Sequence, residues 1–353
     1  MPRASEVLGR SPVQTSGRKA YHLLRRALRS SNSALLGFVL RKSLQVKFNL
    51  TKSLPTGAHR SFASTCQPLD PLRGAAPLPA IDVAVPFVEK DLPALRLVLE
   101  GIHSAIANPI ANLFVVTPGD FLTGQPQFAT PESHQELSDL LVAFPSVTVR
   151  FDRDVLGKNL ASELLDNPER KPGGWHLQQV LKYALARSSA EAATLIVDAD
   201  TVLLSRKTWL RSDGRQLLQF SEEFHQPYMN HFQEFFGLPK HLPASFVTHH
   251  QLMQTDVLNE MFPSEQALVD WLSFGLSEPS LKISEYETYG AYLLAQHPRR
   301  AVFGTWSNLW SPHLDMAKQL ARDSGKTLRE LLPDYCSTSF HSHSQRAGSA
   351  LGA

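Results

Sequence analysis

The sequence predicts an α/β protein with a doubly wound, mostly parallel sheet. From about residue 80 to residue 200, short apolar runs alternate with stretches of helical periodicity, the pattern of strands joined by crossover helices. The runs are rich in Ile, Val and Leu without alternating polar residues, as in strands buried on both faces. One of them, TLIVDADTVLL at residues 194–204, carries two aspartates one residue apart. We therefore take residues 194–204 as the central strand and expect the ligand at its carboxyl end.

The size and composition are those of a globular protein. The chain has 353 residues, enough for one large domain with an appendage or for two modest domains. Hydrophobic residues make up 42% and charged residues 19%, and the longest uncharged apolar run, residues 33–40, is too short to cross a bilayer. Cys66 and Cys336 lie far apart without a CxxC spacing, which argues against a zinc site or a disulfide framework. Cysteine usage of this kind is typical of a reducing compartment, so we expect a cytoplasmic protein.

The net charge of +2 conceals two regions of opposite sign. Residues 1–75 carry 13 Lys and Arg and 2 Asp and Glu, whereas the rest carries 22 basic and 31 acidic residues. Leucines at helical spacing between residues 18 and 46, interleaved with arginines and lysines, predict a basic amphipathic helix that binds an anionic membrane, such as the inner face of the plasma membrane. A solvated tail, a helix packed on the domain and an organelle transit peptide remain alternatives. The leucine face argues against nucleic acid as the partner.

We divide the chain into three parts. Residues 1–79 form the basic, partly helical extension with a Pro-rich linker, residues 80–344 form the α/β domain, and residues 345–353 form a flexible tail. In the domain, IDVAVPF at residues 81–87 predicts a strand that stops at Pro86, and Asp91 with Pro93 marks the first turn of a helix over residues 88–106. Strands follow at residues 112–118 and 146–152, and a glycine pair opens a helix at residues 173–188.

Beyond the central strand the pattern changes. Residues 205–244 are irregular and aromatic, which is typical of a functional loop or lid, although core packing is the more common use of phenylalanine. SFVTHHQLM at residues 245–253 predicts a strand, and helices are expected at residues 255–262, 264–274 and 283–296. This second half is expected to hold the binding site for a second substrate.

Asp198 and Asp200 are the candidate metal ligands. Residues i and i+2 of a strand point to the same side, so both carboxylates can face one ligand. Oxygen ligands of this type suit Mg²⁺ or Mn²⁺, with a phosphate of the substrate completing the shell. The alternative is a strand that runs into a turn, where aspartates cap the next element.

Residues on two neighbouring elements can reach the same site. Gln178, Gln179 and Lys182 share much of one side of the helix before the central strand, and Lys182 and the helix start offer positive charge to a diphosphate. A solvated helix surface is the alternative. Adjacent His249 and His250 point to opposite faces of their strand, so at most one of them faces the pocket.

Acidic residues and histidines near the end of the domain complete the candidates. Glu285 and Glu287 precede an apolar helix, where glutamates normally act as caps. As a functional reading, one of them is the base or the ligand for an acceptor hydroxyl. His341 or His343 can complete the shell of a divalent metal, and a solvated tail is the alternative.

Six segments in this order resemble the GT-A nucleotide-sugar glycosyltransferases: IDVAVPF, GWHLQQVLK, TLIVDADTVLL, SFVTHHQLM, SEYETYGAYL and SFHSHS. The sequence is most similar to a bacterial family of glycosyltransferases known mainly from sequence. The resemblance covers about residues 80–344 and implies a GT-A-like fold. It implies a donor site at Pro86, Phe87, Glu89, Gln178, Gln179, Lys182, Asp198 and His249, metal ligands Asp198, Asp200 and His341, and an acceptor residue at Glu285 or Glu287. The Glu-Asp dipeptide common in the fold is replaced here by Glu-Tyr-Glu, which leaves open which glutamate acts and whether the reaction inverts or retains configuration.

The activity implied is a transfer of sugar from a nucleoside diphosphate sugar to a hydroxyl of a glycan or lipid-linked glycan, dependent on Mn²⁺ or Mg²⁺. DADTV also resembles the first motif of haloacid-dehalogenase-like phosphatases, in which Asp198 would be the nucleophile and Asp200 a general acid. That motif normally opens its domain, whereas about 115 residues of strand-helix sequence precede it here. Another sugar-nucleotide enzyme, such as a nucleotidyltransferase, and a non-catalytic nucleotide-sugar-binding protein are the remaining alternatives.

Overall fold

The computed structural model describes residues 77–120, 125–167, 172–221, 225–240, 242, 244–311 and 313–340. All of them belong to one unit of the chain, residues 66–353. The basic helix expected at residues 18–46, the candidate metal ligand His341 and the tail at residues 345–353 lie outside the described residues. These expectations, and the boundaries at residues 79 and 344, stay predictions.

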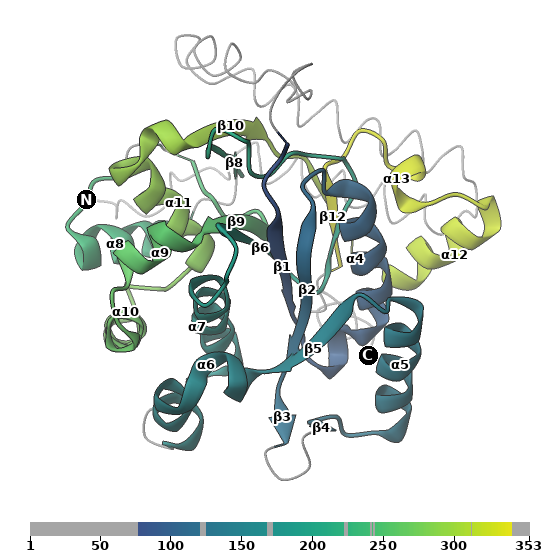
Figure 1. Cartoon of the computed structure of the whole chain (residues 1–353), viewed down its shortest axis with the longest axis horizontal. Coiled ribbons are helices and arrows are strands. Elements are labelled where there is room, and N and C mark those ends of the chain that lie inside the picture. Colours follow the sequence, from purple (N-terminus) through teal and green to yellow (C-terminus); the bar gives the residue numbers. More distant parts are fainter. Residues whose placement is uncertain are drawn as a thin grey trace, which may run out of the picture. The chain divides into compact units, whose positions relative to one another are not determined.

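Five strands form the central sheet, in the order β5-β2-β1-β6-β9 (Figure 1). Their bounds are β5 Val147–Phe151, β2 Ile110–Thr117, β1 Ile81–Pro86, β6 Ala193–Val197 and β9 His250–Gln254. The first four run parallel, and β9 runs antiparallel to β6. Every residue of β1 and β6 is buried, which explains their nearly continuous apolar sequences. The predicted α/β fold with a mostly parallel sheet is confirmed.

Helices cover both faces of this sheet (Figure 1). On one face lie α4 (Leu92–Ala105) and α5 (Pro131–Ala143); on the other lie α6 (Asp152–Ala161), α7 (Gly174–Arg187), α9 (Thr255–Met261) and α11 (Glu285–Gln296). Val83 and Val85 of β1 belong to the buried cluster that includes α4, whereas Ala84 belongs to the cluster that includes α7. The strand therefore joins two cores.

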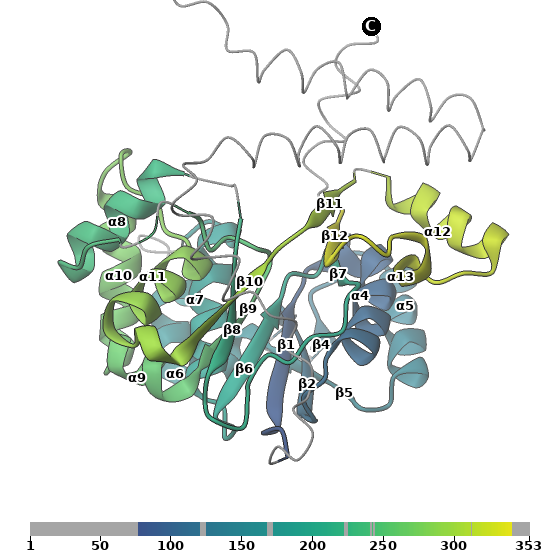
Figure 2. The ribbon, with the colours of Figure 1, turned by 90° about the horizontal axis from the view of Figure 1, so that it is seen from above.

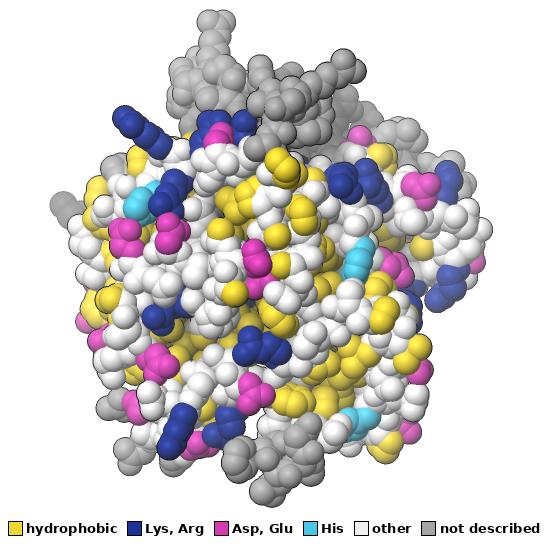
Figure 3. Space-filling model, in the orientation of Figure 1, with side chains coloured by type: hydrophobic (Ala, Val, Ile, Leu, Met, Phe, Trp, Pro, Cys, Tyr) yellow, Lys and Arg dark blue, Asp and Glu magenta, His cyan; other side chains and the backbone are white. Residues whose placement is uncertain are grey.

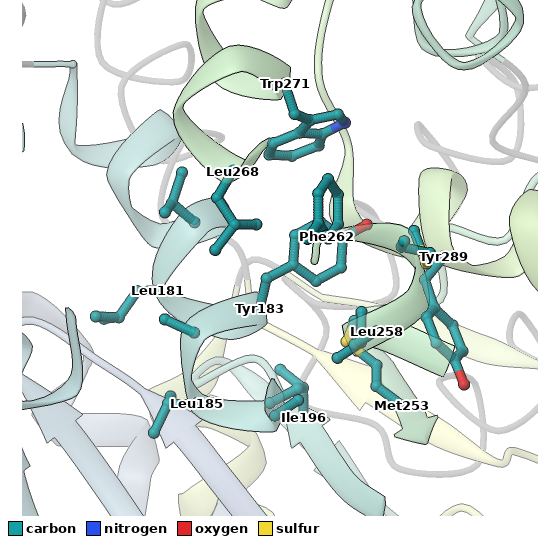
Figure 4. Packing of buried hydrophobic residues seen from close by; sticks show 14 of the residues in the cluster. Leu181, Tyr183, Leu185, Ile196, Met253, Leu258, Phe262, Leu268, Trp271 and Tyr289 are labelled. Carbon is teal, nitrogen blue, oxygen red and sulfur yellow. The ribbon is translucent and has the colours of Figure 1, made fainter. Parts of the chain in front are cut away.

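The core on the α7 side is built from large side chains (Figure 4). The ring of Tyr183 lies 5.0 Å from that of Phe262 and 5.2 Å from that of Trp271, measured between ring centroids. Full burial of an apolar side chain such as Phe262 stabilises the fold by about 1.5–3 kcal/mol. This packing fixes α7, and with it the polar residues that α7 carries toward β6.

Smaller sheets and helices complete the unit. β7 (Thr201–Leu203) pairs antiparallel with β12 (Ser337–Ser339), which pairs parallel with β11 (Asn308–Trp310). β8 (Gln216–Phe220) pairs parallel with β10 (Ala301–Thr305). Figure 2 shows β11, β12, α12 (Leu314–Ser324) and α13 (Leu328–Leu331) on the α4 side, and α8 (Gln226–Phe236), α10 (Glu265–Ser277) and α11 on the other. The short elements are β3 (Gly119–Asp120), β4 (Gln125–Pro126), η1 (Glu89–Asp91), η2 (Ser162–Asp166) and η3 (Pro298–Arg300).

The run expected to be one central strand is two strands with a turn between them. β6 ends at Val197, the N–H of Thr201 donates to the carbonyl of Asp198 at 2.9 Å, and β7 joins a different sheet. The two aspartates thus lie in a turn. The reason given for both carboxylates facing one ligand, alternation along a strand, was wrong, since turn geometry sets their directions; their shared metal role stays a prediction.

The second half departs from the expected elements in two further places. β9 begins at His250, because residues 246–249 are not paired in a ladder and His249 has a φ of 62°. The aromatic stretch over residues 205–244 contains β8 and α8, and Phe232 of α8 is completely buried, so this phenylalanine packs in the core. In the described part of the chain, no helix combines the length and apolar character needed to cross a membrane.

Candidate functional site

Asp198 directly follows β6, which is an internal strand of the central sheet. β6 is flanked by β1 and β9, and the chain connections change direction between β1 and β6, the position where open α/β sheets bind ligands. The N–H of Asp198 donates to the carbonyl of His249 at 2.9 Å. The side chain of Asp198 is 19% exposed. Its backbone is therefore fixed while part of its carboxylate remains in reach of solvent.

Lys182 links this aspartate to α11. Its Nζ lies 2.5 Å from Oδ1 of Asp198 and 2.5 Å from Oε1 of Glu285, and its side chain is 3% exposed. Taking a charge out of water costs several kcal/mol unless a partner compensates, and here one ammonium serves two carboxylates. We expected Lys182 to offer its charge to a diphosphate. The structure instead shows that charge neutralising protein carboxylates.

Tyr286 and His249 complete the surroundings of Asp198. The hydroxyl of Tyr286 donates to Oδ1 of Asp198 at 2.8 Å, and Nδ1 of His249 lies 3.4 Å from Oδ2. The left-handed backbone of His249 is uncommon for a residue other than glycine. It allows both the carbonyl and the ring of His249 to contact the same aspartate. Strained conformations of this kind cluster at functional sites.

The pKa values of these groups are shifted by burial and by one another. Burial alone would raise the pKa of Asp198, but the charge of Lys182 and the hydrogen bond with His249 hold it well below its ordinary value. Burial alone would lower the pKa of Lys182, but Asp198 and Glu285 raise it. Burial raises the pKa of Glu285, and burial together with the charges of Asp198 and Glu285 raises that of Tyr286. At neutral pH the cluster therefore holds an Asp198 carboxylate, a Lys182 ammonium and a neutral phenol.

Asp200 is held by the turn and by the end of the domain. Its Oδ1 accepts a hydrogen bond from Oγ1 of Thr201 at 3.4 Å, and its carbonyl accepts one from the N–H of Phe340 at 2.8 Å. Phe340 follows β12, so the pairing of β12 with β7 brings the chain to Asp200. His341 is the next residue in the sequence and lies outside the described residues.

Asp91, which the sequence indicated only as a residue of a helix start, adds a further carboxylate to the site. Burial raises its pKa, the charges of Asp200 and Asp198 raise it further, and Lys90 lowers it. Among the described residues, the carboxylates of Asp91, Asp198, Asp200 and Glu285 act in this region, and their basic partners are Lys90, Lys182 and His249. On the face shown in Figure 3, by contrast, acidic and basic side chains are interspersed. Carboxylates repel an anionic substrate, so a substrate of this kind would bind beside them more readily with an added cation.

Glu285 is positioned from α7. Its N–H donates to Oε1 of Gln179 at 2.9 Å, and its carbonyl accepts a hydrogen bond from the hydroxyl of Tyr183 at 2.7 Å. Gln179 therefore anchors the start of α11, a different contact from the donor contact expected of it. The role of Glu285 as a base stays a prediction, and its contact in the structure is with Lys182.

Glu287 lies in a separate, fully buried pair. Its Oε1 is 2.5 Å from Nζ of Lys240, its Oε2 accepts the N–H of Phe246 at 2.9 Å, and its side chain is 0% exposed. An acceptor hydroxyl has no access to a carboxylate that is bound on both oxygens and excluded from solvent. This placement argues against the expected acceptor role for Glu287. Two residues of a helix differ by about 200° around its axis, so Glu287 and Glu285 point to nearly opposite sides of α11.

Pro86 and Phe87 form the end of β1. Pro86 is its last residue, and both side chains are buried. The ring of Phe87 packs at 6.1 Å from that of Phe128, and its N–H extends the ladder to β2 by donating to Val116 at 2.8 Å. The side chain of Phe87 thus belongs to the core, and any contact of this residue with a donor falls to its backbone.

Glu89 and Gln178 are the remaining residues of the expected donor site, and both precede Asp198 in the sequence. Oε2 of Glu89 accepts the N–H of Ala129 at 3.0 Å, and hydrogen bonds from Ser133 and Ala129 lower its pKa. Glu89 therefore connects the start of α4 to the start of α5. Gln178 is half-buried on α7, one residue before Gln179. Their expected contacts with a donor stay predictions.

The carboxylates fit a divalent metal only in part. Asp198 and Asp200 supply hard oxygen ligands, which Mg²⁺ and Mn²⁺ prefer. Among the described residues, no three His, Cys, Asp or Glu side chains gather closely enough to hold a metal by themselves. Mg²⁺ is commonly held by one or two carboxylates together with substrate phosphates, and this donor set suits that arrangement.

Two cavities lie away from Asp198. One, of about 490 Å³, borders the start of α5 around Phe128 and His134. The other, of about 190 Å³, lies at the amino ends of β1 and β6, where Asp82 and Thr194 line it. The site around Asp198 is neither of these cavities.

Sequence reasoning missed two contacts of the site. Tyr286 stands between the two glutamates of the Glu-Tyr-Glu motif, so its place in the motif was a signal that could have found it. Trp306 has its ring centroid 6.0 Å from that of His249 and follows β10. No feature of the sequence near residue 306 pointed to this contact.

Glycosyltransferases are among the solved structures that resemble this chain. The bifunctional glycosyltransferase WbbM in its apo form has a TM-score of 0.41 and 14% identity, over 78% of this chain and 47% of WbbM, so the chain spans about half of that protein. The galactosyltransferase LgtC, in complex with donor and acceptor sugar analogs, has a TM-score of 0.40 and 11% identity, over 74% of this chain and 88% of LgtC. Mouse xyloside xylosyltransferase 1 in its apo form has a TM-score of 0.39 and 12% identity, over 75% of this chain and 98% of that protein.

No protein-family model and no curated protein sequence matches the chain. The similar structures have identities of 14% or less and TM-scores of 0.41 or less, so they do not establish a function. The function is therefore inferred from the residues around Asp198.

Proposed function

We propose that this protein is a glycosyltransferase that moves a sugar from a nucleoside diphosphate sugar to a hydroxyl of a glycan or lipid-linked glycan, with Mn²⁺ or Mg²⁺. The observation that carries the proposal is the group of carboxylates at the end of β6, Asp91, Asp198, Asp200 and Glu285, which in the described part of the chain outnumber Lys90 and Lys182, the lysines that act on them. A diphosphate adds further negative charge, so it binds there only together with a cation. The position at the switch point of the sheet supports a nucleotide as the ligand.

Each residue then has a separate task. Asp200 and the part of the Asp198 carboxylate that reaches solvent would hold the metal, which supplies charge stabilisation to the leaving diphosphate. Lys182, Tyr286 and His249 orient Asp198 through the contacts described above. Glu285 holds Lys182 in place from the far side. Groups held in this way need no reorganisation as charge develops in the reaction.

Calorimetric titration of nucleoside diphosphates into the protein, with and without Mn²⁺, tests the proposal. UDP, GDP and ADP would each be titrated, followed by the corresponding sugar nucleotides. We expect at least one of them to bind only when Mn²⁺ is present, and Asp200→Ala to weaken that binding by about tenfold or more. Asp139→Ala is the matched control, because Asp139 is an exposed acidic residue of α5. Equal binding by the Asp200→Ala and Asp139→Ala proteins would reject the metal role.

An activity assay distinguishes the proposed glycosyltransferase from the alternative phosphatase. A phosphatase of the haloacid-dehalogenase type would hydrolyse small phosphoesters and lose that activity in Asp198→Asn. In the structure both oxygens of Asp198 lie within reach of donors from Lys182, Tyr286 and His249, which makes them weaker nucleophiles. Phosphoester hydrolysis without transfer from any sugar nucleotide would overturn the proposal.

A further inference from the structure

A cluster of aromatic side chains, of which Trp175 is exposed and the other three are half-buried, lies where the first turns of α7 and α8 meet. Trp175 of α7 is 44% exposed, and its ring is stacked with that of Tyr228 of α8 at a centroid distance of 6.5 Å and an interplanar angle of 25°. His176 lies edge-on to Trp175 at 5.0 Å, and His225 lies edge-on to Tyr228 at 4.5 Å. We call these four residues the aromatic platform. An exposed tryptophan stacked beside a second aromatic ring presents a flat apolar surface with polar edges, of the kind that is enriched at binding interfaces.

Two chain segments connect the aromatic platform to the Asp198 cluster. Trp175 precedes Lys182 by seven residues on α7, which places both on nearly the same face, about 10 Å apart along the helix. The N–H of Lys282 donates to the carbonyl of Pro227 at 3.3 Å, and Lys282 lies three residues before Glu285. Because Lys182 and Glu285 touch each other, the platform adjoins the cluster through both segments.

The chemistry of the platform favours a sugar ring over other ligands. A sugar presents a flat C–H face that packs on an aromatic ring and a rim of hydroxyls that pair with imidazole nitrogens. Lys282 is close enough for its charge to act on His225, which disfavours a cationic ligand. The switch point for a nucleotide lies between β1 and β6, and α7, which carries Trp175, packs on both strands. Tyr228 belongs to α8, which packs on α11 further from β1 (Figure 2), so the platform extends from the expected donor site toward the second half of the domain.

We propose that the aromatic platform binds a sugar unit of the acceptor, with that unit stacked on Trp175 and Tyr228. The inference rests on the proposed function, since it assigns the second substrate of the same site. It commits to a saccharide as the occupant. A nucleobase stacked on Trp175 is the rival that the experiment must separate.

Tryptophan fluorescence tests the platform directly. The probes are lactose, cellobiose, N,N′-diacetylchitobiose and mannobiose, each titrated with and without UDP and Mn²⁺. We expect at least one of these disaccharides to change the emission of the wild-type protein, and Trp175→Ala to weaken its binding by about tenfold or more. Trp175→Phe, which keeps a ring, should recover most of the affinity. Trp310→Ala is the matched control, because Trp310 of β11 is similarly exposed, at 46%.

The outcomes separate the two proposals. Trp175→Ala should keep the thermal midpoint and the Mn²⁺-dependent nucleotide affinity of the wild type, because its side chain lies at the surface. UDP binding with no disaccharide response, or equal disaccharide affinity in the Trp175→Ala and Trp310→Ala proteins, overturns the platform alone. Loss of UDP affinity in Trp175→Ala assigns the ring to the nucleobase and also overturns it. A disaccharide response that depends on Trp175, in a protein that binds no nucleotide, overturns the proposed function and leaves the platform standing.

Discussion

Replacing Lys182 with methionine removes the ammonium that Asp198 and Glu285 share. Methionine keeps an unbranched apolar stem of similar length, so the packing of the stem against α11 is largely preserved. The variant leaves two carboxylates in a buried place without the cation between them. Removal of one partner of a buried ion pair costs about 3–5 kcal/mol. For a unit of this size, that corresponds to a fall of roughly 10 °C in the thermal midpoint.

The dependence on pH identifies the cause. Burial already raises the pKa of Glu285, and without Lys182 its folded-state pKa rises further. The folded state then binds a proton that the unfolded state releases, so the stability of Lys182→Met increases as the pH falls from 7 toward 5. The deficit relative to the wild type should therefore shrink over this window.

Urea unfolding followed by circular dichroism at pH 7 and pH 5 measures both effects. Glu285→Gln is the first control and should cost less than Lys182→Met, because Asp198 still pairs with the lysine. The double variant Lys182→Met with Glu285→Gln should be more stable than Lys182→Met alone, since one of the unpaired charges is gone. A Lys182→Met protein within about 1 kcal/mol of the wild type at pH 7, or a deficit that grows as the pH falls, would refute this reasoning.

Three other expectations follow from single features of the chain. Burial lowers the pKa of His250 to about 3 from an ordinary 6.5, so below pH 6.5 this residue should cost the wild type about 1.4 kcal/mol of stability per pH unit. In urea unfolding, the stability of His250→Asn should therefore fall less steeply with pH, and an unchanged slope would contradict this. Gly290→Ala places a Cβ 2.4 Å from the ring of Phe246, so a loss of about 1–3 kcal/mol is expected in thermal unfolding, and a stabilised variant would count against the packing described. Deletion of residues 1–75 should leave Mn²⁺-dependent nucleotide binding intact and abolish sedimentation with anionic vesicles at low salt, and a full-length protein that ignores such vesicles would reject the membrane proposal.

The regular elements of the sheet could be predicted because burial leaves a local pattern. IDVAVPF predicted a strand over residues 81–87, and β1 spans Ile81–Pro86. GGWHLQQVLKYALARS predicted a helix over residues 173–188, and α7 spans Gly174–Arg187. The apolar run of β1 is nearly continuous because both faces of the strand are buried, whereas the apolar residues of α7 recur with the helical period. Proline or glycine marks an end of each segment. The position of Asp198 at the end of a buried parallel strand followed from the same pattern.

The contacts of the site were decided by tertiary structure. The sequence named Lys182, Asp198 and Glu285 separately, but 16 and 103 residues separate Lys182 from its two partners, and no periodic pattern relates them. The turn that divides residues 194–204 depends on β7 pairing with β12, which lies more than 130 residues further along the chain. Partners distant in sequence also decide three other features: the left-handed backbone of His249, the start of β9 at His250, and the buried ion pair between Glu287 and Lys240. The local sequence pattern determines which faces of an element are buried. Hydrogen bonds and charges between distant segments determine the direction of each polar group, because a buried polar group needs a partner and the packing of the core decides which partners are near it.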